Sequence, residues 1–315
     1  MSIVTLSLNP TIDMAGEADL VRPTHKIRTF AETYDPGGGG VNVARAITEL
    51  GGEARVVCTA GGFTGAMLDE LLGAVPIPRT IVPIAGRTRI SLTVFERRSG
   101  HEFRFVPSGP EISTGEVEAC LQAVRGLEFK YLVASGSPPR GAADDIFARF
   151  ADIAAAKNAR FILDCSGPGL GVTLERGKVY LVKPSFGELE SLVGRRLDDE
   201  GVRQAASDLV KRGRAEVVVV TMGAAGALLV TKDSVRRMWS PKVRSRSAVG
   251  AGDSFLGAMT LALSQGRDVD DALIFAIAAG AAAALTPGTK LCRRDDVARM
   301  YDELCKSHGG RRLAV

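Results

Sequence analysis

The feature that most constrains the fold of this chain is a regular alternation of strand-like and helix-like segments after residue 113. Short apolar runs, typical of buried strands, occur at 131–135, 160–164, 179–182 and 216–221. Helix-like segments lie around them, at 114–125, 141–157, 186–194 and 200–212. A hairpin is expected at 226–239, and helices after 252. Strands that alternate with helices form a largely parallel sheet covered on both faces. The sequence therefore predicts an α/β fold with a mainly parallel sheet.

The N-terminal half adds a second, β-rich element. It begins with buried strands at 2–8 and 54–60 and helices at 41–50 and 66–72. Residues 11–33 alternate only in part between apolar and polar, and 89–95 and 101–106 flank a turn in the pattern of a β-hairpin. We expect strands from about 11–33 and 88–106 to form a small sheet inserted in a single domain that spans 1–315.

Composition excludes several classes of protein. The net charge of +4 is small for 315 residues, and Lys and Arg do not cluster before Arg311-Arg312, so nucleic acid is not an expected partner. Five cysteines without a CxxC pair, and only three histidines, predict reduced thiols rather than a transition-metal site. The N-terminus has no signal-peptide pattern, and the apolar stretch 272–285 is too short to span a bilayer. We therefore expect a cytoplasmic protein with no membrane partner.

A run of small residues, Val249-Gly250-Ala251-Gly252-Asp253, leads directly into a helix-like apolar segment. The first amides of a helix lack intrahelical partners, and glycines allow a phosphate to approach them closely. A carboxylate beside an anion is unfavourable unless it accepts the proton of the group that attacks the phosphoryl. The run predicts either an anion hole with Asp253 as a base or an ordinary helix cap.

Polar residues in the N-terminal half are candidates to bind a sugar phosphate. Four consecutive glycines at 37–40 allow a ligand to contact bare backbone, and Asn42 offers a donor and an acceptor for sugar hydroxyls. The carboxylate of Asp13 can accept from two hydroxyls. The cations that suit a phosphate are Lys26, Arg28, Arg89 and Arg104. The alternatives are a flexible connector for the glycines and solvated strand faces for the cations.

Two strand ends in the C-terminal half are candidates for a nucleotide site. The strand at 179–182 ends in Lys183-Pro184, and Glu188 follows in the next helix, where it can hold Mg²⁺ directly or through water. Ser185-x-x-Glu188 is also the pattern of a capping box. The strand at 216–221 runs into the small-residue turn 221–226, which leaves room for a nucleotide or forms a tight hairpin.

Taken together, these segments resemble one family. They occur in the order seen in ribokinase-like (PfkB) sugar kinases: Gly37–Asn42, Ser135-Gly136-Ser137, Lys183-Pro184-x-x-x-Glu188, Thr221-x-Gly223-x-x-Gly226 and Val249–Asp253. Thr5-Leu6-x-Leu8-Asn9-Pro10, followed by Asp13, is similar to the phosphosugar kinase branch. Residues 36–46, 104–106 and 244–254 are most similar to the minor 6-phosphofructokinases of enteric bacteria, whereas 86–90 resembles fructose-1-phosphate kinases.

The resemblance implies a ribokinase-like fold and the ATP-dependent phosphorylation of a ketose phosphate, with Mg²⁺ as cofactor. Fructose 6-phosphate is the leading substrate. A 1-phosphofructokinase and a tagatose-6-phosphate kinase are the alternatives, and a non-catalytic sensor of sugar phosphate or nucleotide is a remote one. The small sheet would be the family's β-lid, which commonly pairs two subunits, so a homodimer is expected.

The same resemblance implies a role for each candidate residue. Asp253 would be the base, beside an anion hole formed by the amides of Gly250, Ala251 and Gly252. The sugar would be held by Asp13, Gly38, Gly39 and Asn42, with Ser137 lining the cleft. Lys26, Arg28, Arg89 and Arg104 would lie near the sugar's phosphate or on the lid. ATP would contact Lys183, Ser185, Thr221, Gly223, Gly226 and Ser245, and Glu188 would organise Mg²⁺.

Three segments depart from the family pattern. Ser185 stands where an Asn is usual, and Gly187 stands where close relatives usually carry a Lys. Residues 135–140 read Ser-Gly-Ser-Pro-Pro-Arg, and Thr286-Pro287 replaces polar residues near the nucleotide. The first two replacements weaken the parallel for phosphate and Mg²⁺ contacts, while Glu188 is retained.

Overall fold

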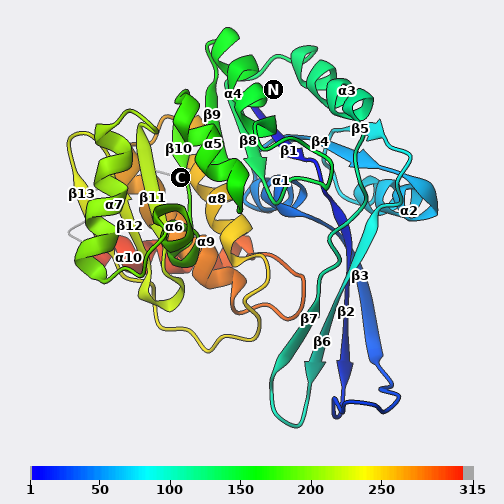
Figure 1. Ribbon diagram of the computed structural model, residues 1–315. Coiled ribbons are helices and arrows are strands. Elements are labelled where there is room, and N and C mark those ends of the chain that lie inside the picture. Colours follow the sequence, from blue (N-terminus) through cyan, green and yellow to red (C-terminus); the bar gives the residue numbers. More distant parts are fainter. Residues whose placement is uncertain (1, 308–315) are drawn as a thin grey trace.

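The computed structural model describes residues 2–307 and contains two separate sheets (Figure 1). The pair Arg311-Arg312, named in the charge analysis, lies outside the described residues. The strands are β1 (Ile3–Ser7), β2 (Thr11–Ala18), β3 (Phe30–Gly37), β4 (Arg55–Ala60), β5 (Arg79–Pro83), β6 (Arg89–Glu96), β7 (Glu102–Phe105), β8 (Tyr131–Ser135), β9 (Arg160–Asp164), β10 (Leu181–Val182), β11 (Val217–Thr221), β12 (Ala227–Val230) and β13 (Val235–Met238). The helices are α1 (Gly39–Glu49), α2 (Gly62–Gly73), α3 (Thr114–Arg125), α4 (Ile146–Ala156), α5 (Pro168–Arg176), α6 (Phe186–Val193), α7 (Asp199–Lys211), α8 (Ala251–Ser264), α9 (Val269–Ala283) and α10 (Arg294–Ser307).

The larger sheet has the order β13-β12-β11-β10-β9-β8-β1-β4-β5. Its strands from β11 to β5 are all parallel, and the hairpin β12–β13 extends it by antiparallel pairing. Neighbouring residues of one strand pack into different clusters: Val217 and Val219 with α1, α8 and α9, and Val218 and Val220 with α3, α4 and α7. Because both faces are covered, these strands are continuously apolar. The predicted α/β fold with a mainly parallel sheet is confirmed.

The smaller sheet extends away from this body (Figure 1). Its order is β3-β2-β6-β7, with β2 parallel to β6 and the outer pairs antiparallel. The predicted hairpin at 89–106 is present as β6 and β7. The second strand expected within 11–33 lies later than predicted: β3 spans Phe30–Gly37, and the residues before Phe30 form the exposed connection from β2.

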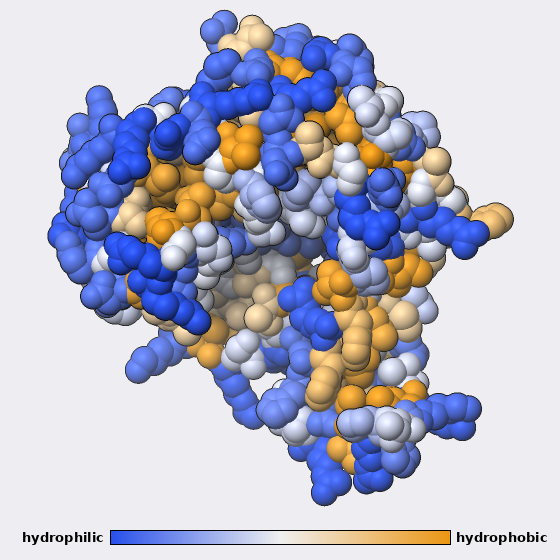
Figure 2. All heavy atoms as spheres, viewed as in Figure 1, coloured by the Kyte–Doolittle hydropathy of each residue, from blue (hydrophilic) through white to orange (hydrophobic). Residues whose placement is uncertain are grey.

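The two faces of the small sheet differ in chemistry. Paired residues on neighbouring strands point to the same face. One row across the sheet is Tyr34, Met14, Leu92 and Phe105, which is entirely apolar. The alternate face carries Asp13 opposite Ser91 and Asp35. Tyr34 and Phe105 are 44% and 55% exposed, and Figure 2 shows hydrophobic colours along this sheet.

Other differences from the sequence prediction include one helix that is shorter than expected and two elements that were not predicted. The helix expected over 141–157 spans only Ile146–Ala156, because 141–145 forms a turn that begins with Gly141 at a φ of +82°. Strand β5 was not predicted, since it is a short edge strand that ends in a proline. Helix α5 was not predicted either, because the glycines at 169 and 171 give it low helix propensity.

No helix within residues 2–307 combines the length and the apolar character needed to cross a bilayer. All five cysteines are buried and free of disulfides, in line with the prediction of reduced thiols.

Candidate active site

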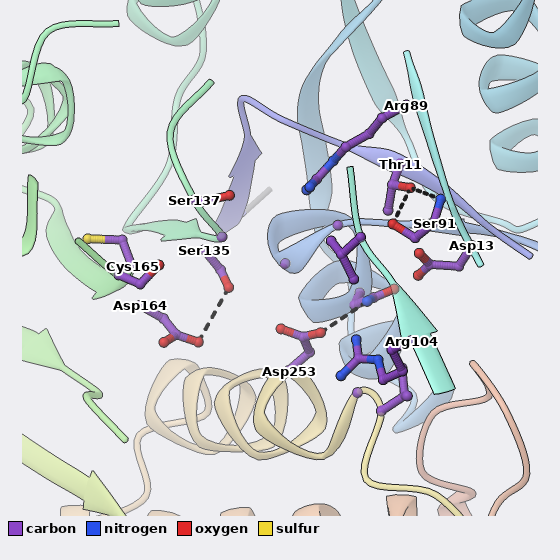
Figure 3. Close-up of a pocket in the computed structure, with 18 of the residues that line it drawn as sticks. Thr11, Asp13, Arg89, Ser91, Arg104, Ser135, Ser137, Asp164, Cys165 and Asp253 are labelled. Carbon is purple, nitrogen blue, oxygen red and sulfur yellow. Dashed lines mark hydrogen bonds between the residues drawn. The ribbon is translucent and has the colours of Figure 1, made fainter. Parts of the chain in front are cut away.

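A cavity of about 270 Å³ lies between the small sheet and the carboxyl ends of β8 and β9 (Figure 3). Ligands of open α/β sheets bind at this edge. The side chains and backbone that line the cavity come from both sheets: Thr11, Asp13, Gly38, Gly39, Asn42, Arg89, Ser91, Arg104, Val106, Ser135, Gly136, Ser137, Asp164, Cys165, Ser166, Glu188, Val249, Gly250 and Asp253. Residues far apart in sequence therefore converge on one cavity.

The glycine run brings the start of α1 to the wall of this cavity. Gly38 has a φ of +98°, which favours glycine, and precedes the first helical residue, Gly39. A Cβ atom on Gly40 would lie 2.2 Å from the carbonyl oxygen of Leu6 at the end of β1. The helix thus begins two residues earlier than predicted, and the glycines form the end of β3, the N-cap and the close-packed start of α1 rather than a flexible connector. This places Asn42 inside the cavity.

Asn42 and Asp253 form the centre of the site. The Asn42 Nδ2 donates to Asp253 Oδ2 at 3.0 Å, across 211 positions of sequence. Gly250, with a φ of +72°, precedes α8, and the Ser254 amide donates to Gly250 O at 2.8 Å. The Ala251 amide donates to Ala248 O at 3.5 Å, and the amides of Gly252 and Asp253, before the first intrahelical bond, stand at the N-terminus of the helix. Burial, followed by the charge of Asp164, raises the pKa of Asp253 to about 6. A carboxylate with this pKa suits a general base near neutral pH.

The small sheet contributes a carboxylate and two guanidinium groups. Burial and the charge of Asp253 raise the pKa of Asp13 to about 6, although nearby arginines oppose the shift. Arg89 is held by backbone carbonyls, donating at 2.8 Å to both Pro107 O and Asn9 O. Arg104 forms no ion pair within residues 2–307 and points into the cavity (Figure 3). Such guanidinium groups match the geometry of a phosphate.

Arg45 connects the small sheet to the centre of the site. Its guanidinium donates to Asn42 Oδ1 at 3.1 Å and pairs with Asp35 Oδ1 of β3 at 3.1 Å. The other oxygen of Asp35 accepts from Thr289 Oγ1 at 2.7 Å. Asn42 in turn donates to Asp253. One chain of hydrogen bonds thus fixes the end of β3, the first turns of α1 and the carboxylate at the start of α8.

Acidic and basic groups also meet next to the cavity, where β9 and β10 end. Lys183 Nζ lies 3.0 Å from Asp164 Oδ1, and both side chains are largely buried. Burial opposes the charge on Lys183, but the carboxylates of Asp164, Glu188 and Asp253 outweigh it and raise the pKa of Lys183. Glu188 Oε2 accepts from the amide and hydroxyl of Ser185, so the predicted capping box is present. Glu188 nevertheless lines the cavity as well.

The structure brings many of the predicted site residues together. Those that line the cavity are Asp13, Gly38, Gly39, Asn42, Arg89, Arg104, Ser137, Glu188, Gly250 and Asp253. Ala251 and Gly252 form the first turn of α8 beside them. Ser185, Thr221 and Gly223 line a neighbouring cavity of about 430 Å³.

Other predicted residues lie elsewhere. Lys26 and Arg28 are exposed in the connection between β2 and β3 and do not line the cavity. Gly226 packs against the backbone of residues 238–240. Ser245 lines a third cavity, between the small sheet and residues 287–290.

Five polar residues of the cavity were given no role in the prediction: Thr11, Ser91, Asp164, Ser166 and Ser135, of which Ser135 belongs to the recognised segment 135–137. Asp164 is the last residue of β9, a largely buried apolar strand, and a polar residue at a strand end is the same signal that singled out Lys183. Thr11 and Ser91 share the face of Asp13 and Arg89 by the two-residue period of a strand, and their hydroxyls lie 3.0 Å apart.

Comparisons with known proteins agree with this geometry. Residues 7–296 match the model of the family described as pfkB family carbohydrate kinase. The chain belongs to this family. It is 45% identical over 303 residues to the ATP-dependent 6-phosphofructokinase isozyme 2 of Mycobacterium tuberculosis, covering 95% of this chain and 89% of the relative. It is 40% identical over 306 residues to the protein of the same name from Escherichia coli, covering 96% and 99%.

A solved structure of a similar protein also matches this fold over nearly the whole chain. The phosphofructokinase-2 of Escherichia coli in complex with potassium superposes with a TM-score of 0.93 at 39% identity, covering 96% of this chain and 99% of that one. The match covers nearly the whole of both chains.

The donor set of the cavity fits the Mg²⁺ ion that pfkB membership implies. Mg²⁺ prefers oxygen ligands and is usually held by one or two carboxylates together with substrate phosphates. The carboxylates of Asp164, Glu188 and Asp253 line the cavity, and one oxygen of Glu188 takes part in neither of its capping bonds. No cluster of three or more metal-ligating side chains occurs in residues 2–307, so the protein offers no closed metal site of its own.

Proposed function

We propose that this pfkB family member is an ATP-dependent 6-phosphofructokinase, which converts fructose 6-phosphate to fructose 1,6-bisphosphate. The observation that carries the proposal is one cavity that combines the hydrogen-bonded Asn42–Asp253 pair with the arginines at 89 and 104. The first two residues suit transfer to a sugar hydroxyl, and the arginines suit a substrate that already bears a phosphate. Both relatives at 40–45% identity carry the name 6-phosphofructokinase.

In the proposed reaction the sugar hydroxyl attacks the γ-phosphorus of ATP. The new O–P bond forms as the bond to ADP breaks, and the hydroxyl proton passes to the carboxylate of Asp253. The free amides at the start of α8 stabilise the charge of the transferring phosphoryl. Asn42 orients Asp253, and the polar face of the small sheet holds the sugar and excludes water. Enzymes that transfer phosphoryl groups act mainly by positioning the reactants and neutralising their charge.

ATP is proposed to bind beside the turn at Thr221–Gly226, with its phosphates directed toward Lys183. Glu188, Asp164 and the bound phosphates would hold Mg²⁺, which neutralises phosphate charge when it is bound. These substrates and five free thiols fit a reducing compartment, so we propose a cytoplasmic enzyme.

An ADP-release assay tests the substrate. The purified enzyme is compared with fructose 6-phosphate, fructose 1-phosphate, tagatose 6-phosphate and unphosphorylated fructose. We expect the highest kcat/KM with fructose 6-phosphate. A higher kcat/KM with fructose 1-phosphate or tagatose 6-phosphate would make that sugar the assigned substrate. If no sugar led to ADP release, a non-catalytic sensor would be favoured.

We also propose a homodimer formed through the small sheet. Its outer row of Tyr34, Leu92 and Phe105 is apolar and partly exposed, and the edge strands β3 and β7 have one unpaired side each within residues 2–307. Pairing with the same face of a second copy would bury the apolar row and cover the unpaired strand edges. Sedimentation velocity at micromolar concentration should give a dimer that Phe105→Glu dissociates; a wild-type monomer would contradict the proposal.

A further inference from the structure

The cavity of about 430 Å³ next to the active site contains a cation that the sequence analysis did not single out. It lies where the turn after β11 meets the start of α6. Most of the residues that line it are uncharged: Ser185, Phe186, Gly187, Asp199, Thr221, Met222, Gly223, Ala225 and Arg237. Arg237 is the cation in this set, and Asp199 is an exposed carboxylate at the first position of α7.

The guanidinium of Arg237 is held in place without being neutralised. It donates to Ala225 O at 3.0 Å and contacts Met222 Sδ at 2.5 Å, so two of its donors rest on the turn after β11. Its Cζ lies 4.7 Å from the centre of the Trp239 ring. Within residues 2–307 it forms no ion pair with a carboxylate. A half-buried guanidinium without a counter-ion is suited to an anion, because three of its five donors remain free for a ligand.

The preceding residue shows the contrast. Successive residues of a strand point to opposite faces. Arg236 points away from this cavity and lies 3.4 Å from Asp270 in an exposed ion pair. The same strand, β13, thus carries one arginine that is already paired and one that is unpaired over the turn.

The start of α6 offers no cation to the same cavity. Gly187 lies on its lining, and a Cβ atom at this position would meet nothing within 4 Å. Glu188, next in the helix, brings a negative charge near it. A polyphosphate that passes along this wall would therefore find its positive charge on β13 rather than on α6.

We propose that Arg237 binds the phosphate groups of the nucleotide and supplies, from β13, the positive charge that α6 lacks at Gly187. This inference rests on the proposed function, because it assumes that ATP binds beside the turn at 221–226. It assigns Arg237 a role in nucleotide affinity and none in proton transfer. The competing role is purely structural: Arg237 would only pack on Trp239 and close the turn through Ala225.

Fluorescence titration distinguishes these roles. Trp239 is the single tryptophan of the chain, and it stacks on Arg237, so its emission reports on ligands of this cavity. Arg237→Gln should weaken MgATP binding about tenfold, because hydrogen bonds to charged groups contribute strongly, and should leave adenosine binding unchanged. Arg236→Gln is the matched control and should bind both like the wild type. An equal loss for ATP and adenosine, or no loss for ATP, would overturn the proposal.

A rescue variant adds a second test. Gly187→Lys has open space, and placed in the Arg237→Gln background it should recover at least half of the lost ATP affinity (as a free energy) by supplying the charge from α6. No recovery in a folded double variant would indicate that position 237 acts through packing. The titration needs no sugar. A wild-type chain that binds ATP but phosphorylates no ketose phosphate would therefore contradict the proposed function alone, whereas a chain that binds no nucleotide would overturn both.

Discussion

The two sheets of this molecule use their faces in opposite ways. The large sheet is covered by helices on both faces, and consecutive residues such as Val218 and Val219 are fully buried on opposite sides. The small sheet has one polar face that borders the cavity and one apolar face that is partly exposed. The first arrangement fixes positions rigidly, because both faces are packed. The second leaves one face available for a ligand and the other for a partner.

The difference divides the work of the site. The base and the helix N-terminus belong to α8, which packs on the large sheet. The groups that would distinguish one sugar phosphate from another, Asp13, Arg89 and Arg104, stand on the small sheet. We infer that the large sheet determines whether phosphoryl transfer occurs, and that the small sheet determines which sugar receives it.

Removal of the base tests the first half of this division and has the largest expected effect. Asp253→Asn keeps the size of the side chain and a polar group near Asn42 but cannot accept the proton. We expect kcat to fall by about 10³-fold, within the usual range for loss of a general base, while the KM for fructose 6-phosphate changes little. Steady-state kinetics measures both. A variant with near-normal kcat would show that another group takes the proton.

Removal of a cation from the small sheet tests the second half. Arg104→Gln should raise the KM for fructose 6-phosphate by about 10- to 100-fold, the scale of a lost charge-assisted hydrogen bond. The KM for unphosphorylated fructose should not rise. Arg97→Gln is the control, since Arg97 lies in the turn between β6 and β7 and pairs with Glu17 in an exposed position. If the KM rose equally for fructose 6-phosphate and for fructose, Arg104 would not bind the phosphate.

The same contrast explains what the sequence could predict. Strands buried on both faces read as unbroken apolar runs such as Val217–Val220, so the large sheet was predictable from local pattern. The glycine run and the turn before Asp253 were recognisable because close approach of backbone leaves glycine as the residue that fits. A strand was predicted at 179–182, where an apolar run ends in Lys-Pro, and the structure keeps only Leu181–Val182 of it as β10.

The remaining features depend on long-range pairing. Arg45 lies within the recognised segment 36–46, but its role follows from contacts with Asp35 and Asn42 that only the fold creates. The parallel pairing of β2 with β6, across about 80 positions, aligns Asp13 with Ser91, and no local pattern shows it. Arg237 joins the neighbouring cavity in the same way, through the register of the β12–β13 hairpin.

The pH dependence of catalysis joins the two sheets in one measurement and has the smallest expected effect. The raised pKa of Asp253, about 6, means that the carboxyl is protonated at lower pH and cannot accept a proton. Wild-type kcat/KM should therefore be level above pH 7 and fall by up to about tenfold per pH unit below pH 6. The cation of Arg104, on the small sheet, acts to lower this pKa. Arg104→Gln should thus move the inflection upward by a fraction of a pH unit.

The test depends on the difference between the kcat/KM pH profiles of the wild type and of Arg104→Gln. The substrate's own phosphate also titrates near pH 6, but its ionisation is the same in both experiments and cancels between them. Arg97→Gln should leave the inflection unchanged, because Arg97 does not face the cavity. Arg104 also acts to lower the pKa of Asp13, which is likewise about 6. An upward shift confined to Arg104→Gln would show that the small sheet sets the protonation of the carboxyls of the site, Asp253 and Asp13, as well as binding the sugar. A shift of zero, or a downward shift, would mean that the two sheets act independently, with the base tuned entirely from the body of the large sheet.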